Sequence, residues 1–266
     1  MSNLNSIREK FEKNGVALIK NFCSSEYLLK LVKKSIEFSL NNPSPFAKKI
    51  NNGNGDFFYD YWTYKRNNSI KELLKSEDFI NKIKSISGNK KLNFFHDHIL
   101  VKYNSAPDTP WHQDRPYYFV DGKKNFSIWI TTDHIQENSS LAFCRKSHLS
   151  GNEYLPVSFE NKQIIGNNDF LKELNNEIIY EEAASGIEIY NMKPGDAIIF
   201  NNKTIHKSMP SASDKSRSAL SLRFIGDDAF ITKKYVNATP PFDKFGMKVE
   251  EGAKPDIKWF PELPLS

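Results

Sequence analysis

The sequence predicts an α+β protein that is mainly β, with helices near the N-terminus and short strands through the rest of the chain. About residues 5–90 contain segments whose apolar side chains recur with the 3.6-residue period of a helix. From about residue 92 onward, short alternating or apolar runs are separated by turn residues, as in β-sandwiches and barrels. There is neither a strand–helix–strand rhythm nor a glycine-rich phosphate loop, which argues against Rossmann and P-loop folds. We therefore expect one domain over residues 1–266, in which helices support a β-sandwich or barrel.

The N-terminal section begins with a charged helix over residues 7–13, which Asn14-Gly15 should end, and continues with an apolar strand over residues 16–19. Ser24 or Ser25 is placed to cap the next helix. The apolar positions of that helix follow the helical period and are Leu28, Leu31, Val32 and Ile36. These signals place one short strand between two helices.

Three segments follow before residue 90. Residues 41–55 are rich in Asn, Pro, Ser and Gly and are expected to form a loop. The aromatic run over residues 57–62 is expected to pack a sheet against helices rather than to contact a ligand. A further helix is expected over residues 70–86, ending at Gly88.

Strands dominate the chain from residue 92. In the first, over residues 92–103, alternation places His96, His98, Leu100 and Lys102 on one face and Phe95, Asp97, Ile99 and Val101 on the other. A second strand, over residues 126–132, should have Ser127, Trp129 and Thr131 opposite Ile128 and Ile130. Further strands are expected over residues 187–190, 197–200 and 218–225.

Two segments lack such patterns. The long polar region over residues 151–182 has one helical indication, at residues 170–174. Loop segments of this length are commonly functional, and we expect a lid that influences substrate choice. The proline-rich tail over residues 231–266 is expected to lie as extended coil against the body of the protein.

The composition is that of a folded protein with dispersed charge. Phe (20), Tyr (11) and Trp (4) are abundant, which favours a sheet-rich fold over disorder. The formal net charge is +5, but the lysines are scattered among acidic residues without the block that is typical of nucleic-acid binding. We expect no nucleic-acid partner, and no feature of the sequence specifies an oligomeric state.

The two cysteines, Cys23 and Cys144, provide neither a disulfide framework nor a C-x-x-C pair, which favours a reducing compartment. The first 13 residues are polar and charged, without the apolar region of a signal peptide. No apolar run approaches the roughly 18–20 residues that a membrane span requires. We therefore expect a cytoplasmic protein without membrane association.

Three residues have the chemistry of a metal site. On an extended strand His112 and Asp114 would point to the same side, and His206 follows the apolar run at residues 197–200. Two neutral imidazoles and one carboxylate, with the other coordination positions open, form the facial triad that holds non-haem Fe(II). Arg217 shares a strand face with Ala219, Ser221 and Arg223, and a buried arginine requires an anion. The carboxylate of 2-oxoglutarate matches this requirement better than a structural salt bridge.

With these residues the chain resembles the phytanoyl-CoA dioxygenase family, from about residue 10 to the C-terminus. The resemblance is carried by residues 109–114, 116–118, 126–130, 139–141, 147–148, 194–196, 206–217 and 223–229. Two places depart from the family pattern. Cys-Arg-Lys-Ser-His at residues 144–148 stands where Pro-Gly-Ser-His is frequent, and Ala219 stands two residues after Arg217 where serine is frequent.

The resemblance implies a double-stranded β-helix, or jelly roll, over about residues 92–230 with flanking N-terminal helices. It implies Fe(II) bound by His112, Asp114 and His206, with 2-oxoglutarate and O₂ as cosubstrates. The residues expected to contact 2-oxoglutarate are Arg217, Trp129, Lys102 and His98.

The implied activity is hydroxylation of an unidentified small molecule, with release of succinate and CO₂. Asp114 supports this outcome, because relatives that halogenate lack the carboxylate. Arg115, Tyr117 and Tyr118 directly follow Asp114 and are expected to line the substrate entrance. Together with Lys102 and Arg223, Arg115 favours an anionic or polar substrate.

Two other functions are left open by the sequence. His96 and His98 have the spacing of paired cupin ligands, which would give a metal-binding protein with other chemistry, although residues 100–104 contain no acid. A non-catalytic jelly-roll binding module that retains the motif is the second alternative.

Overall fold

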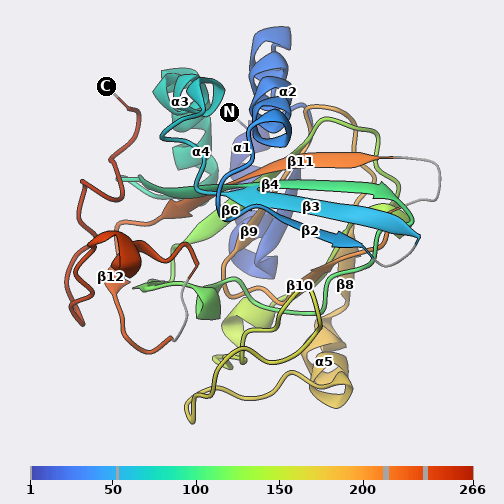
Figure 1. Cartoon of the computed structure of the whole chain (residues 1–266), viewed down its shortest axis with the longest axis vertical. Helices are drawn as coiled ribbons and strands as arrows, with labels where there is room; N and C mark the ends of the chain where they lie inside the picture. Colours follow the sequence, from blue (N-terminus) through green and yellow to red (C-terminus); the bar gives the residue numbers. More distant parts are fainter. Residues whose placement is uncertain (1, 52–53, 212–215, 236–238, 266) are drawn as a thin grey trace.

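The computed structural model describes residues 2–51, 54–211, 216–235 and 239–265. Its large sheet has seven strands in the order β1-β9-β6-β11-β4-β3-β2, and all of its pairs are antiparallel. A second sheet has the order β10-β7-β8, and β5 pairs with β12. In Figure 1, α2, α3 and α4 lie on one side of the large sheet, and β8, β10 and α5 lie on the other. The predicted α+β, mainly β class is confirmed.

The helices and strands have the following bounds. The strands are β1 (Val16–Ile19), β2 (Lys48–Asn51), β3 (Gly55–Tyr61), β4 (Asn93–Asn104), β5 (Val120–Asp121), β6 (Phe126–Thr131), β7 (Leu141–Cys144), β8 (Ile187–Ile189), β9 (Ala197–Asn201), β10 (His206–Ser208), β11 (Arg217–Ile225) and β12 (Phe230–Ile231). The α-helices are α1 (Ser2–Asn14), α2 (Glu26–Asn41), α3 (Asn68–Lys75), α4 (Glu77–Ser87) and α5 (Asn176–Glu182).

The large sheet separates a helix-covered core from a cavity. One face of β6 and β11 packs against the helices through apolar side chains, and these are Ile128, Ile130, Leu220, Leu222 and Phe224. The helices contribute Ile7, Phe11, Leu31, Val32, Ile36, Leu73 and Ile83 to the same core. Burial of this apolar area fixes which way the alternating strands face, because a slip by one residue would exchange the two faces. The side chains on the opposite face of these strands therefore point toward the cavity.

A bulge in β4 changes one part of the expected alternation. Arg223 pairs with His96 and Phe224 pairs with Phe94, so Phe95 is an extra residue on β4. Phe94 therefore takes the helix-facing position that the sequence pattern assigned to Phe95. Phe95 packs instead beside the ring of Tyr118, with ring centroids 4.8 Å apart.

Three expected boundaries differ from the structure. The loop expected over residues 41–55 contains β2, whose pairing with β3 outweighs its polar composition, and residues 52–53 lie outside the described part. The helix expected over residues 70–86 is two helices, because Ser76 has extended backbone and caps the second. The helix in the region over residues 151–182 is α5, capped by Asn175, and not residues 170–174.

The N-terminal section and the tail both contribute to the β-rich body. β1, β2 and β3 belong to the large sheet, so residues 5–90 are not only a helical addition to a core over residues 92–230. In the tail, Phe242 and Phe260 are fully buried against Phe95, whereas residues 236–238 and 266 lie outside the described part. Among the described helices, none combines the length and the apolar composition needed to cross a membrane.

The start of α2 provides a test of the fold. The Ser25 side chain accepts a hydrogen bond from the Leu28 amide (3.2 Å), whereas the neighbouring Ser24 is exposed and makes no such bond. Ser25→Ala should lower the free energy of unfolding by about 1 kcal/mol, because the amide loses its cap. Ser24→Ala is the matched control and should leave the denaturant midpoint unchanged. Equal effects of the two substitutions would contradict the assignment of the cap.

Candidate metal centre and cosubstrate pocket

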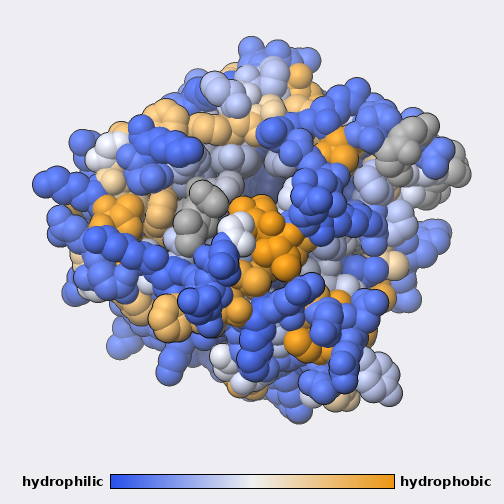
Figure 2. Space-filling model, turned by 60° about the horizontal axis from the view of Figure 1, so that its bottom comes forward, coloured by the Kyte–Doolittle hydropathy of each residue, from blue (hydrophilic) through white to orange (hydrophobic). Residues whose placement is uncertain are grey.

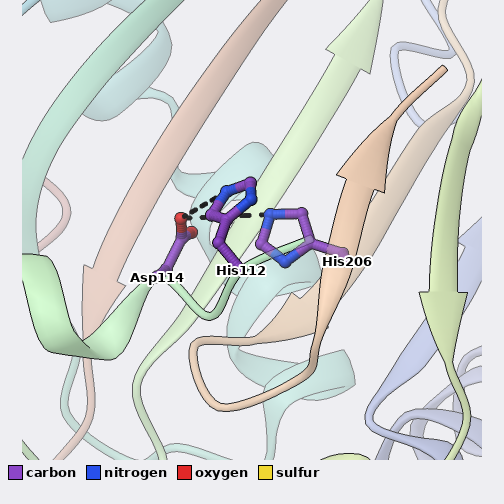
Figure 3. A group of neighbouring side chains, drawn as sticks. All are labelled: His112, Asp114 and His206. Atoms are coloured by element: carbon purple, nitrogen blue, oxygen red, sulfur yellow. Dashed lines mark ion pairs between the residues drawn. The ribbon is translucent and has the colours of Figure 1, made fainter. Parts of the chain in front are cut away.

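His112, Asp114 and His206 come together in the fold although they lie far apart in the sequence. Their candidate ligand atoms all lie within 4.8 Å of one another, and all three side chains are buried. Figure 3 shows the three side chains pointing toward a common point. Within the part of the chain that the structure describes, this is the one group of three or more His, Cys, Asp or Glu residues close enough to hold a metal ion.

The route by which these residues converge differs from the expected one. The segment around His112 and Asp114 is not a strand, because only His112 forms an isolated bridge. The bridge joins His112 to His206: each amide donates to the other residue's carbonyl, both at 2.9 Å. Backbone pairing between a loop and the start of β10 therefore replaces strand alternation as the cause of the geometry.

Both imidazoles are oriented by backbone carbonyls. Nδ1 of His112 lies 2.9 Å from the Pro110 carbonyl, and Nδ1 of His206 lies 2.9 Å from the Thr204 carbonyl. A carbonyl can only accept, so each Nδ1 carries the proton and each Nε2 presents a lone pair. Both Nε2 atoms lie 4.0 Å from Oδ1 of Asp114, too far for a hydrogen bond. The three donor atoms are thus positioned to share one cation.

The protonation states suit metal binding. Burial, together with the neighbouring His206, lowers the pKa of His112 to about 3, and burial also lowers the pKa of His206. Burial alone would raise the pKa of Asp114, but Arg223 and the two histidines outweigh burial and lower it. A guanidinium nitrogen of Arg223 lies 3.5 Å from Oδ1 of Asp114. Two neutral imidazoles and one carboxylate are therefore present at neutral pH.

Arg217 lies in the same cavity with its charge uncompensated by a close anion. Its guanidinium donates to the carbonyls of Ser139 and Ser140 and to the hydroxyl of Ser208. Among the described residues, no carboxylate oxygen lies within 4 Å of it, although Asp133 interacts with it at longer range. Burial lowers the pKa of Arg217 to about 10, so it remains charged at neutral pH. It lies over the ring of Trp129, 5.8 Å from the ring centroid.

Two of the expected contact residues lie outside the cavity wall. The ammonium group of Lys102 donates to the carbonyls of Pro107 and Met209, so it ties the end of β4 to two loops. Arg115 is buried in ion pairs with Asp121 and Glu153. The sequence shows the strand face of Lys102 and the neighbours of Arg115, but not the groups that pair with the two cations.

The remaining expected residues line a cavity of about 260 Å³. His98 contributes from β4, and Tyr117 and Tyr118 contribute from the turn after Asp114. Tyr117 also accepts a hydrogen bond from the Val157 amide (2.8 Å) and donates to its carbonyl (2.7 Å). This double contact holds the region over residues 151–182 against the cavity.

Several aromatic side chains of the cavity wall belong to the run over residues 57–62, for which the sequence predicted only a packing role. Phe57, Tyr59 and Tyr61 on β3 all line the cavity, while Phe58 packs against the helix-covered core. Phe57, Tyr59 and Tyr61 are spaced two residues apart, as on one face of a strand, and this spacing could have predicted that they share the cavity face. Phe159 lies 4.9 Å from the ring of His112 and carried no such signal, because it stands in an irregular loop.

Comparisons with known proteins agree with this geometry. The family model described as phytanoyl-CoA dioxygenase (PhyH) matches residues 11–219. The dioxygenase lolE1 of Epichloe uncinata is 28% identical over 154 residues, which cover 57% of this chain and 52% of that protein. The match thus spans about half the length of that relative.

Solved structures share the fold at low sequence identity. The non-haem α-ketoglutarate-dependent epimerase SnoN from nogalamycin biosynthesis has a TM-score of 0.75 at 14% identity, with 100% of this chain and 97% of that chain covered. The carbocyclase SnoK from nogalamycin biosynthesis has a TM-score of 0.71 at 14% identity, covering 97% and 95%. EvdO2 of Micromonospora carbonacea var. aurantiaca, solved with 2-oxoglutarate, has a TM-score of 0.59 at 19% identity, covering 87% and 94%.

These likenesses confirm the predicted jelly roll with flanking helices. The family match covers most of the sequence and includes His112, Asp114, His206 and Arg217. The chain belongs to the phytanoyl-CoA dioxygenase family.

Proposed function

We propose that this protein hydroxylates a small molecule, using Fe(II), 2-oxoglutarate and O₂. The observation that carries the proposal is the presence of the His112–Asp114–His206 group and the charged Arg217 in the wall of one cavity. When bound, iron and its two cosubstrates supply the oxidising power for C–H hydroxylation, with release of succinate and CO₂.

The donor set fits the metal. Two imidazole nitrogens and one carboxylate oxygen are the protein ligands of non-haem Fe(II) oxygenases, and the carbonyls behind both Nδ1 atoms hold the rings in place. His112, Asp114 and His206 would hold the iron. Because Asp114 takes up one ligand position, the arrangement favours hydroxylation over halide transfer.

The cosubstrate site is assigned by charge and shape. Arg217 presents a planar cation suited to the distal carboxylate of 2-oxoglutarate, and Trp129 provides an apolar wall beside it. His98 lies on the same side of the sheet, and within the described part of the chain its Nε2 has no hydrogen-bond partner, so its contact with the cosubstrate is part of the proposal. Lys102 is left out of it, because two carbonyls already occupy its ammonium group.

The residues around the centre would exclude water. Tyr117 holds Val157 by two hydrogen bonds, and Phe159 from the same loop covers His112. We propose that residues 151–182 act as the lid of the cavity. Closing the cavity strengthens the interactions inside it and limits side reactions.

Substitution of the metal ligands separates the proposal from a cupin-like site. His112→Ala and His206→Ala should each abolish binding of one Fe(II) per chain, because only one imidazole and one carboxylate of the candidate ligands then remain. His96→Ala should retain the iron, since His96 is not part of the group of three. Metal analysis after desalting measures the stoichiometry, and circular dichroism checks the fold. Iron lost in His96→Ala but kept in His112→Ala and His206→Ala would favour the cupin alternative.

Arg217 should control 2-oxoglutarate binding without controlling iron binding. Arg217→Ala should weaken the binding of 2-oxoglutarate about 100-fold. Arg217→Lys should weaken it less, because lysine keeps the positive charge but cannot donate two parallel hydrogen bonds to a carboxylate. Anaerobic titration of the visible charge-transfer band of the Fe(II)–2-oxoglutarate complex measures the affinity. Arg66→Ala, a partly exposed arginine outside the cavity, is the control and should bind normally. Normal cosubstrate binding in all three variants would exclude the proposed role.

Metal binding should vary little between about pH 8 and pH 6. Burial holds the pKa of His112 at about 3 and lowers the pKa of His206 from its ordinary value, so protons compete less for the lone pairs of both imidazoles. Titration with Co(II), followed by visible absorption at several pH values, tests this. A loss of affinity of about tenfold per pH unit below the ordinary histidine pKa would show that a ligand titrates normally.

Turnover separates an enzyme from a binding module. Succinate release by the iron-loaded protein, measured against metabolite pools, should rise in the presence of the substrate. Normal binding of iron and 2-oxoglutarate without succinate release in any pool would favour the non-catalytic alternative.

A further inference from the structure

The cavity wall away from Arg217 is aromatic and apolar. Its rings come from four separate parts of the chain and are Phe46, Tyr59, Tyr61, Tyr117 and Phe159. The face that comes forward in Figure 2, on which β10 and α5 lie, is hollowed near its centre, with hydrophobic residues at the edge of the hollow. Several aromatic rings around one cavity can contact a bound ring edge-to-face or by offset stacking, which favours a ring-containing ligand. The cavity volume of about 260 Å³ lies at the low end for small-molecule sites.

The charged groups in this wall are compensated by protein groups. Arg223 lies beside Asp114 and donates to the hydroxyl of Tyr118. Lys48 and Glu160, the other charged residues of the wall, lie 3.6 Å from each other and are half-exposed. Arg217 is assigned to the cosubstrate. Of the cations that favoured an anionic substrate, Lys102 and Arg115 lie outside the wall. A charged substrate would therefore lose its hydration and have to compete with these protein groups for a counter-ion.

One edge of the cavity is nevertheless polar. Ser221 and Arg223 on β11 and His96 on β4 line the cavity. Each has a buried polar atom without a hydrogen-bond partner among the described residues: Ser221 Oγ, Arg223 Nη1 and His96 Nε2. Arg223 pairs with His96 across the two strands, so these atoms form one edge of the sheet floor. Burial lowers the pKa of His96, so its ring is neutral at physiological pH. An unpaired buried polar atom is costly, which indicates that molecules in the cavity satisfy these groups.

We propose that the substrate is an uncharged, ring-containing molecule that carries at least one hydroxyl or carbonyl group. This inference rests on the proposed function and specifies its substrate class. The aromatic wall holds the ring, and the edge formed by His96, Ser221 and Arg223 orients the polar group. The combination of a ring contact and a hydrogen bond would fix which C–H bond faces the metal centre.

Matched probes test the charge and shape of the ligand. The probes are 2-naphthol, naphthalene, 2-naphthoate, 2-naphthylmethylammonium and 1-decanol. They are added without O₂ to protein loaded with Fe(II) and 2-oxoglutarate, and perturbation of the charge-transfer band gives the affinity. The neutral 2-naphthol should bind at least about tenfold more tightly than either charged analogue and than the linear alcohol. Equal or tighter binding of 2-naphthoate overturns the charge argument, and equal binding of 1-decanol overturns the ring argument.

Substitutions locate the bound probe. Phe159→Ala should weaken 2-naphthol about tenfold through the lost ring contact, whereas Phe170→Ala, an exposed phenylalanine of the same loop region, should have no effect. Ser221→Ala should reduce the preference for 2-naphthol over naphthalene and leave naphthalene binding unchanged. Equal effects of the two phenylalanine substitutions would place the probe on the surface and contradict the proposal.

The design separates failure of this inference from failure of the proposed function. The charge-transfer band reports cofactor loading before any probe is added, so its absence counts against the proposed function alone. In that case calorimetry on the metal-free Arg217→Ala protein measures the same selectivity, because the anionic probe can no longer use the cosubstrate's arginine. Selectivity for 2-naphthol there would support the substrate class, and its absence would contradict it.

Discussion

The candidate site depends on one pair of backbone hydrogen bonds, those exchanged by His112 and His206. They join a loop without regular structure to the first residue of β10 and place the two imidazoles side by side. The carbonyls of Pro110 and Thr204 then turn both Nε2 atoms toward Asp114. Backbone groups supply every one of these constraints. The positions of the histidines therefore depend on the loop conformation and the strand pairing, and much less on neighbouring side chains.

The packing of one face of the large sheet determines which side chains line the cavity on the other face. Strands β4 and β11 bury apolar residues under the helices on one face, and the same alternation places His98, Ser221 and Arg223 on the cavity face. The polar face is buried as well, so its groups must find partners or leave atoms unsatisfied. Arg217 finds neutral acceptors that leave its charge available. Burial of the apolar face under the helices offsets the stability that the unpaired polar atoms on the cavity face cost.

Much of this could be predicted from the sequence, because alternation and spacing are local properties. The strand faces of β6 and β11 and the N-terminal cap of α2 follow from such patterns. His112, Asp114 and His206 are indicated by their ligand chemistry, and the pairing of a loop with β10 is what brings them together. The errors arose where tertiary contacts decide. The register shift at Phe95 depends on pairing with β11, and Met209 and Glu153, which are partners of Lys102 and Arg115, lie far away in the sequence. The position of Phe159 could not be predicted either, because a loop has no regular periodicity that shows which way a side chain points.

Arg223 links the metal centre to the rest of the cavity. It lies 3.5 Å from Asp114 and bonds to Tyr118, so the same guanidinium contacts a candidate metal ligand and an aromatic group of the wall. Buried with these partners, it stabilises the ionised carboxylate while one of its nitrogens remains unpaired in the cavity. A substrate oxygen that accepts a hydrogen bond from that nitrogen would therefore contact the side chain that lies beside Asp114. Substrate binding and the position of Asp114 would then be connected through a single side chain.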